Sequence, residues 1–513
     1  MTKTDNPSGI TRRHFLATTA LAGAAVATGA TLAPLAEGPE AFAAETETIN
    51  PARCYTGGCY SCEYDAHIRG GHVVNITPTK DALFGRRPCL RGYAQIQRMY
   101  SEGRLKYPLK RKEGTARGAG EWERITWDEA ISTIAAHWTE DRATYGSYSI
   151  AFAGASGCAR FSCLAGTRMA MVMQMTSVDL SVDWALYQGL HWVYGDPSAG
   201  IMTRPGNEPA DLDFVNAKTI MNWGDNRSEA QAQRWRLMIE AHRQGTKLVT
   251  IDPNFTLAAQ RSDKWYANRP GTDSALMLGM MNVIVNEGLQ DTAYLMSDTI
   301  APYLVRSDTG MLLRMSDLGV EPVAAGYDMY GQPIMQDNPA IWVDGAAVDC
   351  SAMLTGAVPE MEGTFTTPDG VEVKTAYTKL VEHLAQYTPE RVSAICELSV
   401  EDIRELAHLA ADGPVTHIMG LGNQAYNNGI HVGTGIGTLM ALTGMVGKPG
   451  AGFEQTTEGP IYNQLWILPT FTFSNSISAL QLPHVIETGT FMGNPYSPIR
   501  SLLIRGSGIV GAA

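Results

Sequence analysis

The chain has 513 residues, of which 44% are hydrophobic and 18% are charged, and its formal net charge is −13. A single hydrophobic core stops growing near ~250–300 residues, so this length predicts several domains. The negative charge argues against a nucleic-acid or anionic-membrane partner, because binding to phosphate groups needs a basic face.

Residues 1–43 have the pattern of an export signal. A twin-arginine pair at 12–13 precedes an uncharged stretch rich in Ala, Thr and Gly at 17–35, and an Ala-Phe-Ala cleavage motif follows at 41–43. A transmembrane anchor is the alternative interpretation of this stretch. Because twin-arginine signals serve proteins that fold, and often load a cofactor, before export, we expect a cofactor-containing protein. Its expected location is the periplasm or the outer face of the cytoplasmic membrane.

Four of the eight cysteines lie close together near the expected mature N-terminus. Their spacing, C-x4-C-x2-C-x26-C, supplies enough thiolates for one iron–sulfur cluster and, taken alone, mildly favours a [2Fe–2S] centre. A zinc site and a pair of disulfides are the alternatives that the spacing leaves open. The candidate ligands are Cys54, Cys59, Cys62 and Cys89.

The first predicted element is a strand at 72–76, after a glycine turn in a small β-rich module that contains the four cysteines. A helix begins at Thr126, because Glu129 completes a capping box and apolar residues follow at helical spacing. Strands and helices then alternate, which is typical of an α/β fold with its ligands at the carboxyl ends of the strands. The predicted elements of that region are strands at 150–154, 219–224 and 247–252 and a helix at 229–243.

The second half of the chain begins with an irregular stretch at 301–375, rich in Gly, Pro and Asp and without clear periodicity. Helical spacing returns further on, where Ser399 with Asp402 predicts the cap of a helix. A strand at 415–419 then leads into the glycine-rich turn at 420–423, which predicts a second nucleotide-type turn between a strand and a helix.

Several motifs, in the same order along the chain, resemble those of the dimethyl sulfoxide reductase family. The cysteine module ends in Cys-Leu-Arg-Gly at 89–92, similar to the family's Cys-x-Lys/Arg-Gly. Two features depart from the pattern. The cysteine spacing C-x4-C-x2-C differs from the family's commonest C-x2-C-x3-C or C-x3-C-x3-C, and Arg227 stands where proline is usual. The further matches are Ile-Thr-Trp-Asp-Glu-Ala at 125–130, Asn-Trp-Gly-Asp-Asn at 222–226, Ile-Asp-Pro at 251–253, Arg-Pro-Gly-Thr-Asp-Ser-Ala-Leu at 269–276, Gly-Leu-Gly at 420–422 and Leu-Thr-Gly-Met-Val-Gly-Lys-Pro-Gly at 442–450.

The resemblance implies a [4Fe–4S] cluster on the four cysteines, with Arg91 between the cluster and a pterin. It also implies molybdenum or tungsten held by bis-molybdopterin guanine dinucleotide. Asp252 is the best candidate for a contact to a ribose hydroxyl or a guanine edge, and Asp273 is next. A nicotinamide site is not expected, because residues 154–157 do not supply Gly-x-Gly-x-x-Gly. The candidate cofactor-binding residues are Gly224, Asp225, Asn226, Asp252, Pro253, Arg269, Gly271, Asp273, Gly420, Gly422 and Asn428.

The protein's own ligand to the metal is expected in Leu-Ser-Val-Asp-Trp at 180–184, which resembles a string of the nitrate reductase branch. Asp183 is the first choice and Ser181 the second. A hard carboxylate or alkoxide oxygen suits a high-valent metal that cycles through an oxo group. His191 is a candidate proton donor, although a buried aromatic helix face explains it equally well.

The expected architecture is α/β, with a small N-terminal iron–sulfur domain and two doubly wound units. The predicted parts are a signal peptide at 1–43, an iron–sulfur domain at 44–110, one α/β domain formed by 111–145 with 375–513, and a pterin-dinucleotide domain at 146–374. The C-terminal barrel of the family is expected to be absent.

The implied function is that of a catalytic subunit that removes an oxygen atom or a hydroxyl group from a small substrate. Electrons would pass through the [4Fe–4S] cluster from an iron–sulfur electron-transfer subunit, and a membrane-anchor subunit is a further expected partner. Two alternatives remain open at this point: a non-redox hydratase or hydroxyltransferase on the same cofactor, and an inactive truncated remnant.

Overall fold

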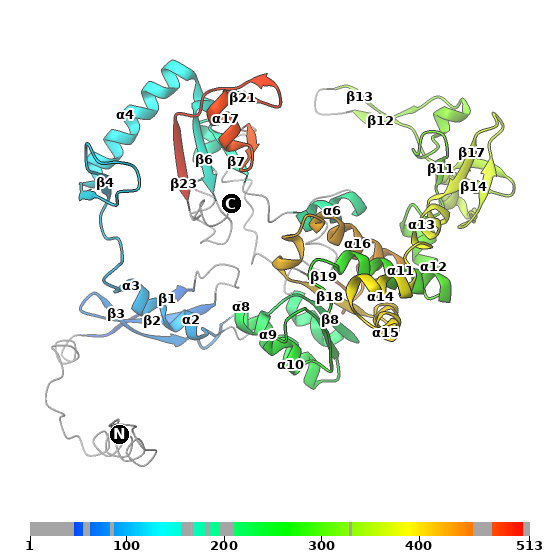
Figure 1. The fold of residues 1–513 in the computed structure, drawn as a ribbon, viewed down its shortest axis with the longest axis horizontal. Coiled ribbons are helices and arrows are strands. Elements are labelled where there is room, and N and C mark those ends of the chain that lie inside the picture. Colours follow the sequence, from blue (N-terminus) through cyan, green and yellow to red (C-terminus); the bar gives the residue numbers. More distant parts are fainter. Residues whose placement is uncertain are drawn as a thin grey trace, which may run out of the picture.

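The computed structural model describes most of the chain. The described residues are 46–54, 62–82, 87–154, 166, 168–179, 185–194, 210–327, 331–454 and 475–505. Within these ranges, no helix combines the length and the apolar character needed to cross a membrane. Two parallel sheets with helices on their faces dominate the described residues, which confirms the predicted α/β class (Figure 1).

A small antiparallel sheet lies at the N-terminal end of the described residues, and its third strand confirms the strand predicted at 72–76. Gly70 and Gly71 form the turn before that strand with φ angles of 55° and 77°, a region that favours glycine. The strands are β1 (Thr48–Arg53), β2 (Glu63–Arg69) and β3 (His72–Pro78).

The larger parallel sheet has five strands in the order β10-β9-β8-β18-β19. From β8 the chain winds to one side of the sheet, and from β18 it winds to the other side. The strand order therefore reverses between β8 and β18, where a ligand crevice is expected outside the carboxyl ends of the strands. The elements are β8 (Thr219–Trp223), α9 (Ala232–Arg243), β9 (Lys247–Ile251), β10 (Lys264–Tyr266), β18 (Val415–Met419), α16 (Gly429–Leu442) and β19 (Gly452–Glu454).

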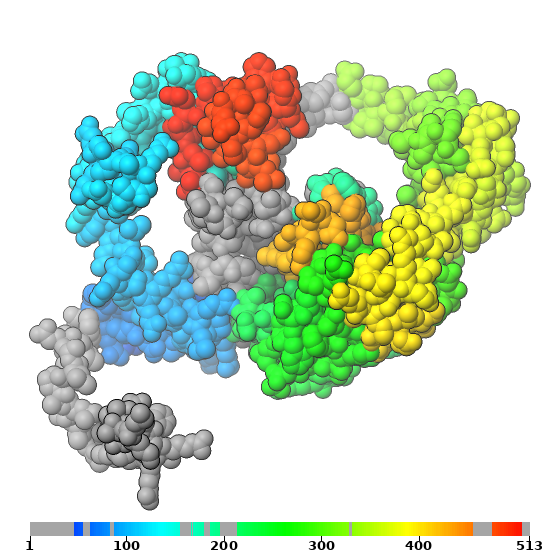
Figure 2. Space-filling view, in the orientation of Figure 1, coloured from blue at the N-terminus to red at the C-terminus, as the bar shows by residue number. Residues whose placement is uncertain are grey.

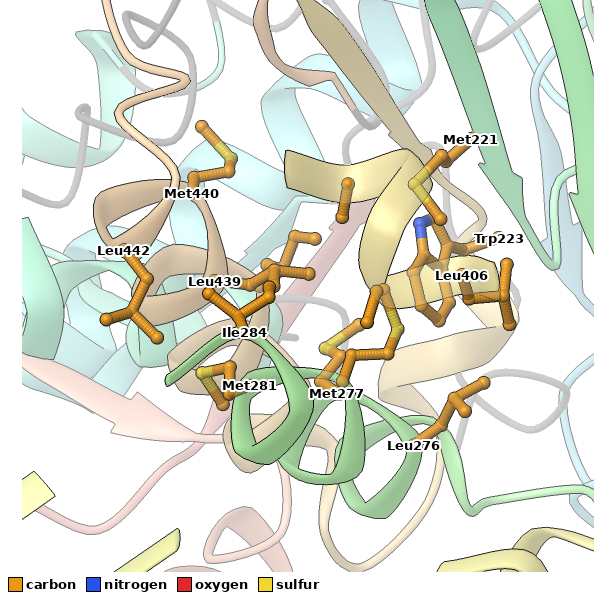
Figure 3. Packing of buried hydrophobic residues seen from close by; sticks show 14 of the residues in the cluster. Met221, Trp223, Leu276, Met277, Met281, Ile284, Leu406, Leu439, Met440 and Leu442 are labelled. Carbon is orange, nitrogen blue, oxygen red and sulfur yellow. The ribbon is translucent and has the colours of Figure 1, made fainter. Parts of the chain in front are cut away.

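Helices bury both faces of this sheet. On one face Met221 and Trp223 pack with side chains of α11, α15 and α16, as Figure 3 shows. On the other face Ile220 packs with Met238 of α9. Each large apolar side chain buried in this way stabilises the fold by about 1.5–3 kcal/mol. Four of the helices around this sheet are α6 (Ala185–Tyr194), α11 (Asp273–Glu287), α14 (Pro389–Cys396) and α15 (Val400–Ala411).

Helix α6 packs on α16 through glycines. A Cβ atom at Gly189 would collide with the backbone of Ile430, and one at Gly433 would collide with the carbonyl group of Leu186. The two helix backbones approach this closely because neither glycine carries a side chain. In addition, the Leu186 N–H donates a hydrogen bond of 3.1 Å to Oε1 of Gln424. The first turn of α6 is therefore fixed to the loop that follows β18.

The second parallel sheet has four strands in the order β20-β7-β6-β23. Trp138 of α4 packs with Ile150 and Phe152 on one face, and Val485 of α17 packs with Ala151 on the other. The predicted cap of α4 is confirmed, because the Glu129 N–H donates to the Thr126 hydroxyl. The elements are α4 (Trp127–Tyr145), β6 (Ile150–Gly154), β7 (Thr176–Asp179), β20 (Ser476–Ser478), α17 (Leu482–Thr488) and β23 (Ser501–Arg505).

The two parallel sheets divide the chain differently from the predicted domain ranges. Each sheet joins strands from 146–374 with strands from 375–513, since β8 pairs with β18 and β6 pairs with β23. Figure 2 shows the same arrangement, with the green part of the chain in contact with the orange part. The predicted boundary between 374 and 375 therefore does not separate the sheets, because strands from late in the chain complete both of them.

Residues 301–375 contain short antiparallel strands, although the sequence shows no periodicity there. Each strand has only three to five residues, which is too short for an alternation of apolar and polar residues to be recognised in the sequence. The strands are β11 (Leu304–Arg306), β12 (Val323–Tyr327), β13 (Pro333–Gln336), β14 (Ala340–Val343), β15 (Ala346–Asp349), β16 (Thr364–Thr366) and β17 (Glu372–Thr375).

Candidate functional site

The carboxyl ends of β8, β9, β10 and β18 bring the candidate nucleotide-binding residues to one edge of the larger sheet. Asn428 joins this edge through its side-chain amide, which donates to the Gly271 carbonyl and the Ser274 hydroxyl, both at 3.0 Å. By strand, the residues are Gly224, Asp225 and Asn226 after β8, Asp252 and Pro253 after β9, Arg269, Gly271 and Asp273 after β10, and Gly420 and Gly422 after β18.

Glycines shape the point where the strand order reverses. A Cβ atom at Gly420 would collide with the carbonyl group of Gly224, and one at Gly224, whose φ is 56°, would collide with the Asn423 side chain. Gly422 differs: its two chain neighbours aside, no atom of a described residue lies within 4 Å of the position of its missing Cβ. Gly224 and Gly420 therefore let the two loops touch each other, whereas Gly422 leaves room for an approaching ligand.

Asp273, at the start of α11, has a buried carboxylate held by two asparagines. Its Oδ1 accepts from the amide of Asn268 at 3.2 Å and from the amide of Asn423 at 3.1 Å. Burial raises the pKa of Asp273 to about 6, although hydrogen bonds from its own backbone and from Asn268 and Asn423 act in the opposite direction. The Oδ1 atom of Asn268 is also buried and has no hydrogen-bond partner among the described residues. Two buried acceptor groups therefore lie together at the edge.

Asp252 provides a second buried carboxylate at the end of β9. Its Oδ1 accepts from the Asn254 N–H at 2.7 Å, and its backbone carbonyl accepts from the Trp265 indole at 2.7 Å. Burial raises the pKa of Asp252, an effect that the Asn254 N–H partly offsets. The negative charge of Asp252 contributes to the raised pKa of Asp273. Both carboxylates thus carry an unfavourable desolvation that a hydrogen-bond-donating ligand would relieve.

Asp273→Asn should stabilise the protein without cofactor at pH 8 by about 3 kcal/mol, which corresponds to a pKa near 6 in the fold against 3.8. Below pH 4 the carboxyl is protonated in both states, so the stability gain of the variant should vanish. Between pH 4 and 6 only the unfolded state releases the proton, so the wild-type stability falls as the pH rises. Urea denaturation between pH 4 and 8 measures this difference, and a gain independent of pH would contradict the assignment.

The Asp225 carboxylate takes part in a buried network of ion pairs and does not face a ligand. Its carboxylate pairs with Arg227 Nε at 2.5 Å, and Arg227 Nη1 reaches Oε1 of Glu454 at 2.5 Å. Arg234 pairs with the same Glu454 oxygen at 2.7 Å. The side chain of Asn226 also bonds within the protein, since it accepts from Ser228 at 2.6 Å. We therefore retain the backbone of residues 224–226, and not the Asp225 carboxylate, among the candidate ligand contacts.

Three of the four candidate cluster cysteines lie in the described residues. Cys54 and Cys62 are buried and joined by a backbone hydrogen bond of 2.9 Å, and Cys89 precedes the short helix α2 (Leu90–Tyr93). A Cβ atom at Gly92 of that helix would lie 3.9 Å from the Cys54 sulfur. In the described part of the chain, no three His, Cys, Asp or Glu side chains are grouped closely enough to hold a metal ion. Cys59 lies outside the described residues, so the full set stays a prediction.

Arg91 connects the cysteine module to the edge of the larger sheet that carries the candidate nucleotide-binding residues, here called the nucleotide edge. Its guanidinium donates to the carbonyl groups of Glu229 and Ala230, the latter at 3.0 Å. These carbonyls close the short helix α8 (Arg227–Ala230), which follows the loop after β8. The place of Arg91 between the cluster and the pterin stays a prediction.

The predicted metal ligands Asp183 and Ser181 lie outside the described residues, just before α6. His191 lies on α6, and its Nδ1 is buried without a hydrogen-bond partner in the described part of the chain. Sequence reasoning missed Asn268, Asn423 and Gln424, although all three are buried polar residues at the edge. Asn423 ends the predicted glycine-rich turn at 420–423 and Gln424 directly follows it, which was the available signal, whereas nothing local indicated Asn268.

A family model described as molybdopterin oxidoreductase matches residues 104–494. A dimethyl sulfoxide reductase catalytic chain of Halobacterium salinarum, itself assigned only by prediction, is 30% identical over 474 residues, with 87% of this chain and 54% of that one covered. The alpha chain of perchlorate reductase from Dechloromonas aromatica is 30% identical over 433 residues, covering 77% and 45%. Dimethyl sulfoxide reductase DmsA of Escherichia coli is 27% identical over 512 residues, covering 94% and 55%.

The chain spans about half the length of these curated relatives. Among solved structures, acetylene hydratase from Pelobacter acetylenicus aligns with a TM-score of 0.47 and 19% identity, over 76% of this chain and 43% of that one. The family model covers well over half of the chain, including the whole nucleotide edge. The chain therefore belongs to the molybdopterin oxidoreductase family, with dimethyl sulfoxide reductase catalytic subunits among its relatives.

Proposed function

We propose that the chain is the catalytic subunit of a molybdenum or tungsten bis-pterin oxidoreductase that removes an oxygen atom or a hydroxyl group from a small substrate. The observation that carries the proposal is the edge at the strand-order reversal. There, two buried acceptor groups, Asp273 and Asn268, lie beside loops brought together by glycines. Family membership supplies the cofactor class, because the matched residues include this entire edge.

The residues at the edge fit a guanine dinucleotide. Gly422 leaves room for a phosphate to approach the backbone, and Asp252 and Asp273 would accept from ribose hydroxyls or from the base. Arg269 is exposed at the same edge, where a guanidinium would pair with phosphate oxygens. When bound, the pterin-held metal supplies the two-electron oxygen-transfer chemistry. Asp183, with Ser181 as the alternative, is the proposed protein ligand to that metal.

We further propose that Cys54, Cys59, Cys62 and Cys89 bind a [4Fe–4S] cluster. The buried positions of Cys54 and Cys62, and the approach of Cys54 to the helix that Cys89 starts, support this ligand set. Arg91, tied to α8, would then lie between the cluster and the dinucleotide. Thiolates are the protein ligands that iron–sulfur clusters use.

Cys62→Ala should reduce the iron content of the purified protein to near zero and remove its visible iron–sulfur absorption band, because the cluster would lose one of its four thiolates. Metal analysis together with the absorption spectrum provides the measurement. Cys396→Ala is the matched control, since Cys396 is equally buried but lies on α14. Full iron content in Cys62→Ala would refute the proposed ligand set.

Electrons for the reduction would come from a partner iron–sulfur subunit, and a membrane-anchor subunit is a further proposed partner. The names of several relatives, such as the alpha subunit of respiratory nitrate reductase, identify them as subunits of larger assemblies, which supports this proposal. The twin-arginine pattern at 12–13 supports export to the periplasm or to the outer face of the membrane.

The decisive experiment is metal and pterin analysis of the protein purified from its own host, followed by substrate-dependent oxidation of reduced viologen. Molybdenum or tungsten with pterin, together with viologen oxidation, is the expected result. Bound cofactor without viologen oxidation by any of the oxyanions and sulfoxides tested would favour the non-redox alternative. Absence of both metal and pterin would show that the proposed function is wrong.

A further inference from the structure

The short hairpin that precedes α4 has one face without acidic residues. Its strands, β4 (Leu109–Arg111) and β5 (Trp122–Arg124), pair antiparallel, with Leu109 opposite Arg124 and Arg111 opposite Trp122. Directly opposite residues of such a pair share a face, and successive residues along each strand alternate between the two faces. One face of the hairpin therefore carries two arginines, a leucine and a tryptophan.

Tyr107 extends this face, because the guanidinium carbon of Arg124 lies 3.2 Å from the centre of the Tyr107 ring. The other arginine, Arg111, donates to the Thr115 carbonyl in the loop of the hairpin. Neither arginine forms an ion pair with a described residue, so no neighbouring carboxylate neutralises their positive charges. The name β4–β5 face is used below for Tyr107, Leu109, Arg111, Trp122 and Arg124.

The carboxylates of the two strands lie on the opposite face of the hairpin. Glu123 stands opposite Lys110 in the strand register, and Lys112 pairs with Glu121 at 4.0 Å. Lys110 also lies 3.8 Å from the carboxylate of Glu129 at the start of α4. The lysines of this opposite face are thus balanced by carboxylates, whereas the arginines of the β4–β5 face are not.

The apolar side chains of the β4–β5 face are open to solvent. Trp122 is 54% exposed, Tyr107 is 49% exposed and Leu109 is 42% exposed. The hairpin lies at the outer margin of the molecule in Figure 1. Tryptophan and tyrosine are the residues enriched at the interface between membrane and water, and long basic side chains reach from apolar surface to polar headgroups. A face with cations and no carboxylate suits a surface of closely spaced phosphates better than a protein surface of mixed charge.

The net charge of −13 argues against binding of the chain as a whole to an anionic membrane. At an ionic strength of about 0.1 M, however, exposed charges more than about 10 Å apart are largely screened from each other. The potential of an anionic membrane surface falls off over the same distance. The charges nearest to the membrane therefore decide the interaction, and on the β4–β5 face these charges are positive.

We propose that the β4–β5 face binds the surface of a bilayer that contains anionic phospholipids. The rings of Tyr107 and Trp122 would lie among the headgroups, and Arg111 and Arg124 would pair with lipid phosphates. Such a contact would attach the chain directly to a membrane, whether or not an anchor subunit is present. The inference goes beyond the proposed function, because it uses no residue of the nucleotide edge and none of the candidate cluster or metal ligands.

The test is sedimentation of the full chain with vesicles made of equal parts of phosphatidylglycerol and phosphatidylcholine, and with vesicles of phosphatidylcholine alone. The wild type should bind the mixed vesicles more tightly than the neutral ones, and its binding should weaken as the ionic strength rises towards about 1 M. Arg124→Glu should weaken binding to the mixed vesicles about tenfold, because it removes one attractive charge and adds a repulsive one. Trp122→Ala should weaken it about fivefold, because the ring no longer leaves water on binding. Residues 1–43 are the same in every variant, so these differences report on the β4–β5 face.

Arg243→Glu is the matched control for Arg124→Glu, because it makes the same change in net charge on α9, where the Arg243 side chain is 74% exposed. Tyr327→Ala is the control for Trp122→Ala, because Tyr327 is an exposed aromatic residue of β12. Both controls should bind the mixed vesicles like the wild type. Circular dichroism should show that all variants fold.

Three outcomes would overturn the proposal. Equal weakening by Arg243→Glu and Arg124→Glu would show that the net charge, and not the β4–β5 face, governs binding. Equally tight binding to neutral and mixed vesicles would exclude a role for the anionic headgroups. Self-association of the chain that Trp122→Ala removes, without any binding to vesicles, would assign the β4–β5 face to contact with a second copy.

Discussion

Replacing Asp183 with alanine should reduce turnover more than about a hundredfold while leaving the iron content unchanged. Loss of a group that only supports a metal ligand commonly lowers metal affinity or activity ten- to hundredfold, so loss of the ligand itself should lower activity further. The four proposed cluster cysteines are unaffected by this substitution. Turnover is measured as substrate-dependent oxidation of reduced viologen, and iron by metal analysis of the same sample. Together they separate loss of the molybdenum or tungsten ligand from loss of the cluster.

Ser181→Ala is the matched control for Asp183→Ala, because it removes the alternative oxygen ligand two residues earlier. This variant should keep turnover close to that of the wild type. X-ray absorption at the metal edge should show a lost oxygen ligand only in Asp183→Ala. Unchanged coordination in Asp183→Ala together with a lost oxygen ligand in Ser181→Ala would reverse the assignment.

The sequence predicted well those features that depend on a few neighbouring residues. Thr126 and Ser399 cap their helices as expected, because each cap joins residues three positions apart. The strands at 150–154 and 415–419 were also predicted correctly, since buried strands of parallel sheets are short apolar runs between clear boundaries. Motifs of this local kind also follow β8, β9, β10 and β18, whose carboxyl ends lie at one edge of the larger sheet, so the candidate nucleotide contacts lie together there.

Features that depend on distant residues could not be predicted in the same way. The pairing of β8 with β18 joins segments about two hundred residues apart and made the predicted boundary at 374 unsuitable for dividing the sheets. The same limit applies to Asn268, whose importance depends on Asp273 and, through it, on Asn423 from the turn after β18. The buried network around Asp225 was not predictable either, because Arg227, which pairs with Asp225, also pairs with Glu454 from far along the chain.

Glu454→Gln should destabilise the protein by about 3–5 kcal/mol, the usual cost of removing one partner from a buried ion pair. The Glu454 carboxylate is 1% exposed and accepts from Arg227 at 2.5 Å and from Arg234 at 2.7 Å. Glutamine keeps the size of the side chain but removes its charge, so both buried guanidiniums would lose the carboxylate with which they pair. Urea denaturation at pH 7, followed by circular dichroism, measures the loss of stability.

Glu382→Gln provides the comparison that isolates burial as the cause. Glu382 pairs with Lys374 at 2.6 Å, a distance between the two made by Glu454, but its side chain is 53% exposed. Exposed pairs contribute about 0–1 kcal/mol, so this variant should be nearly as stable as the wild type. Equal effects of the two substitutions would show that the buried network does not stabilise the loop after β8. A loss of stability confined to Glu454→Gln would instead show that the buried ion pairs of Arg227 and Arg234 stabilise the loop after β8.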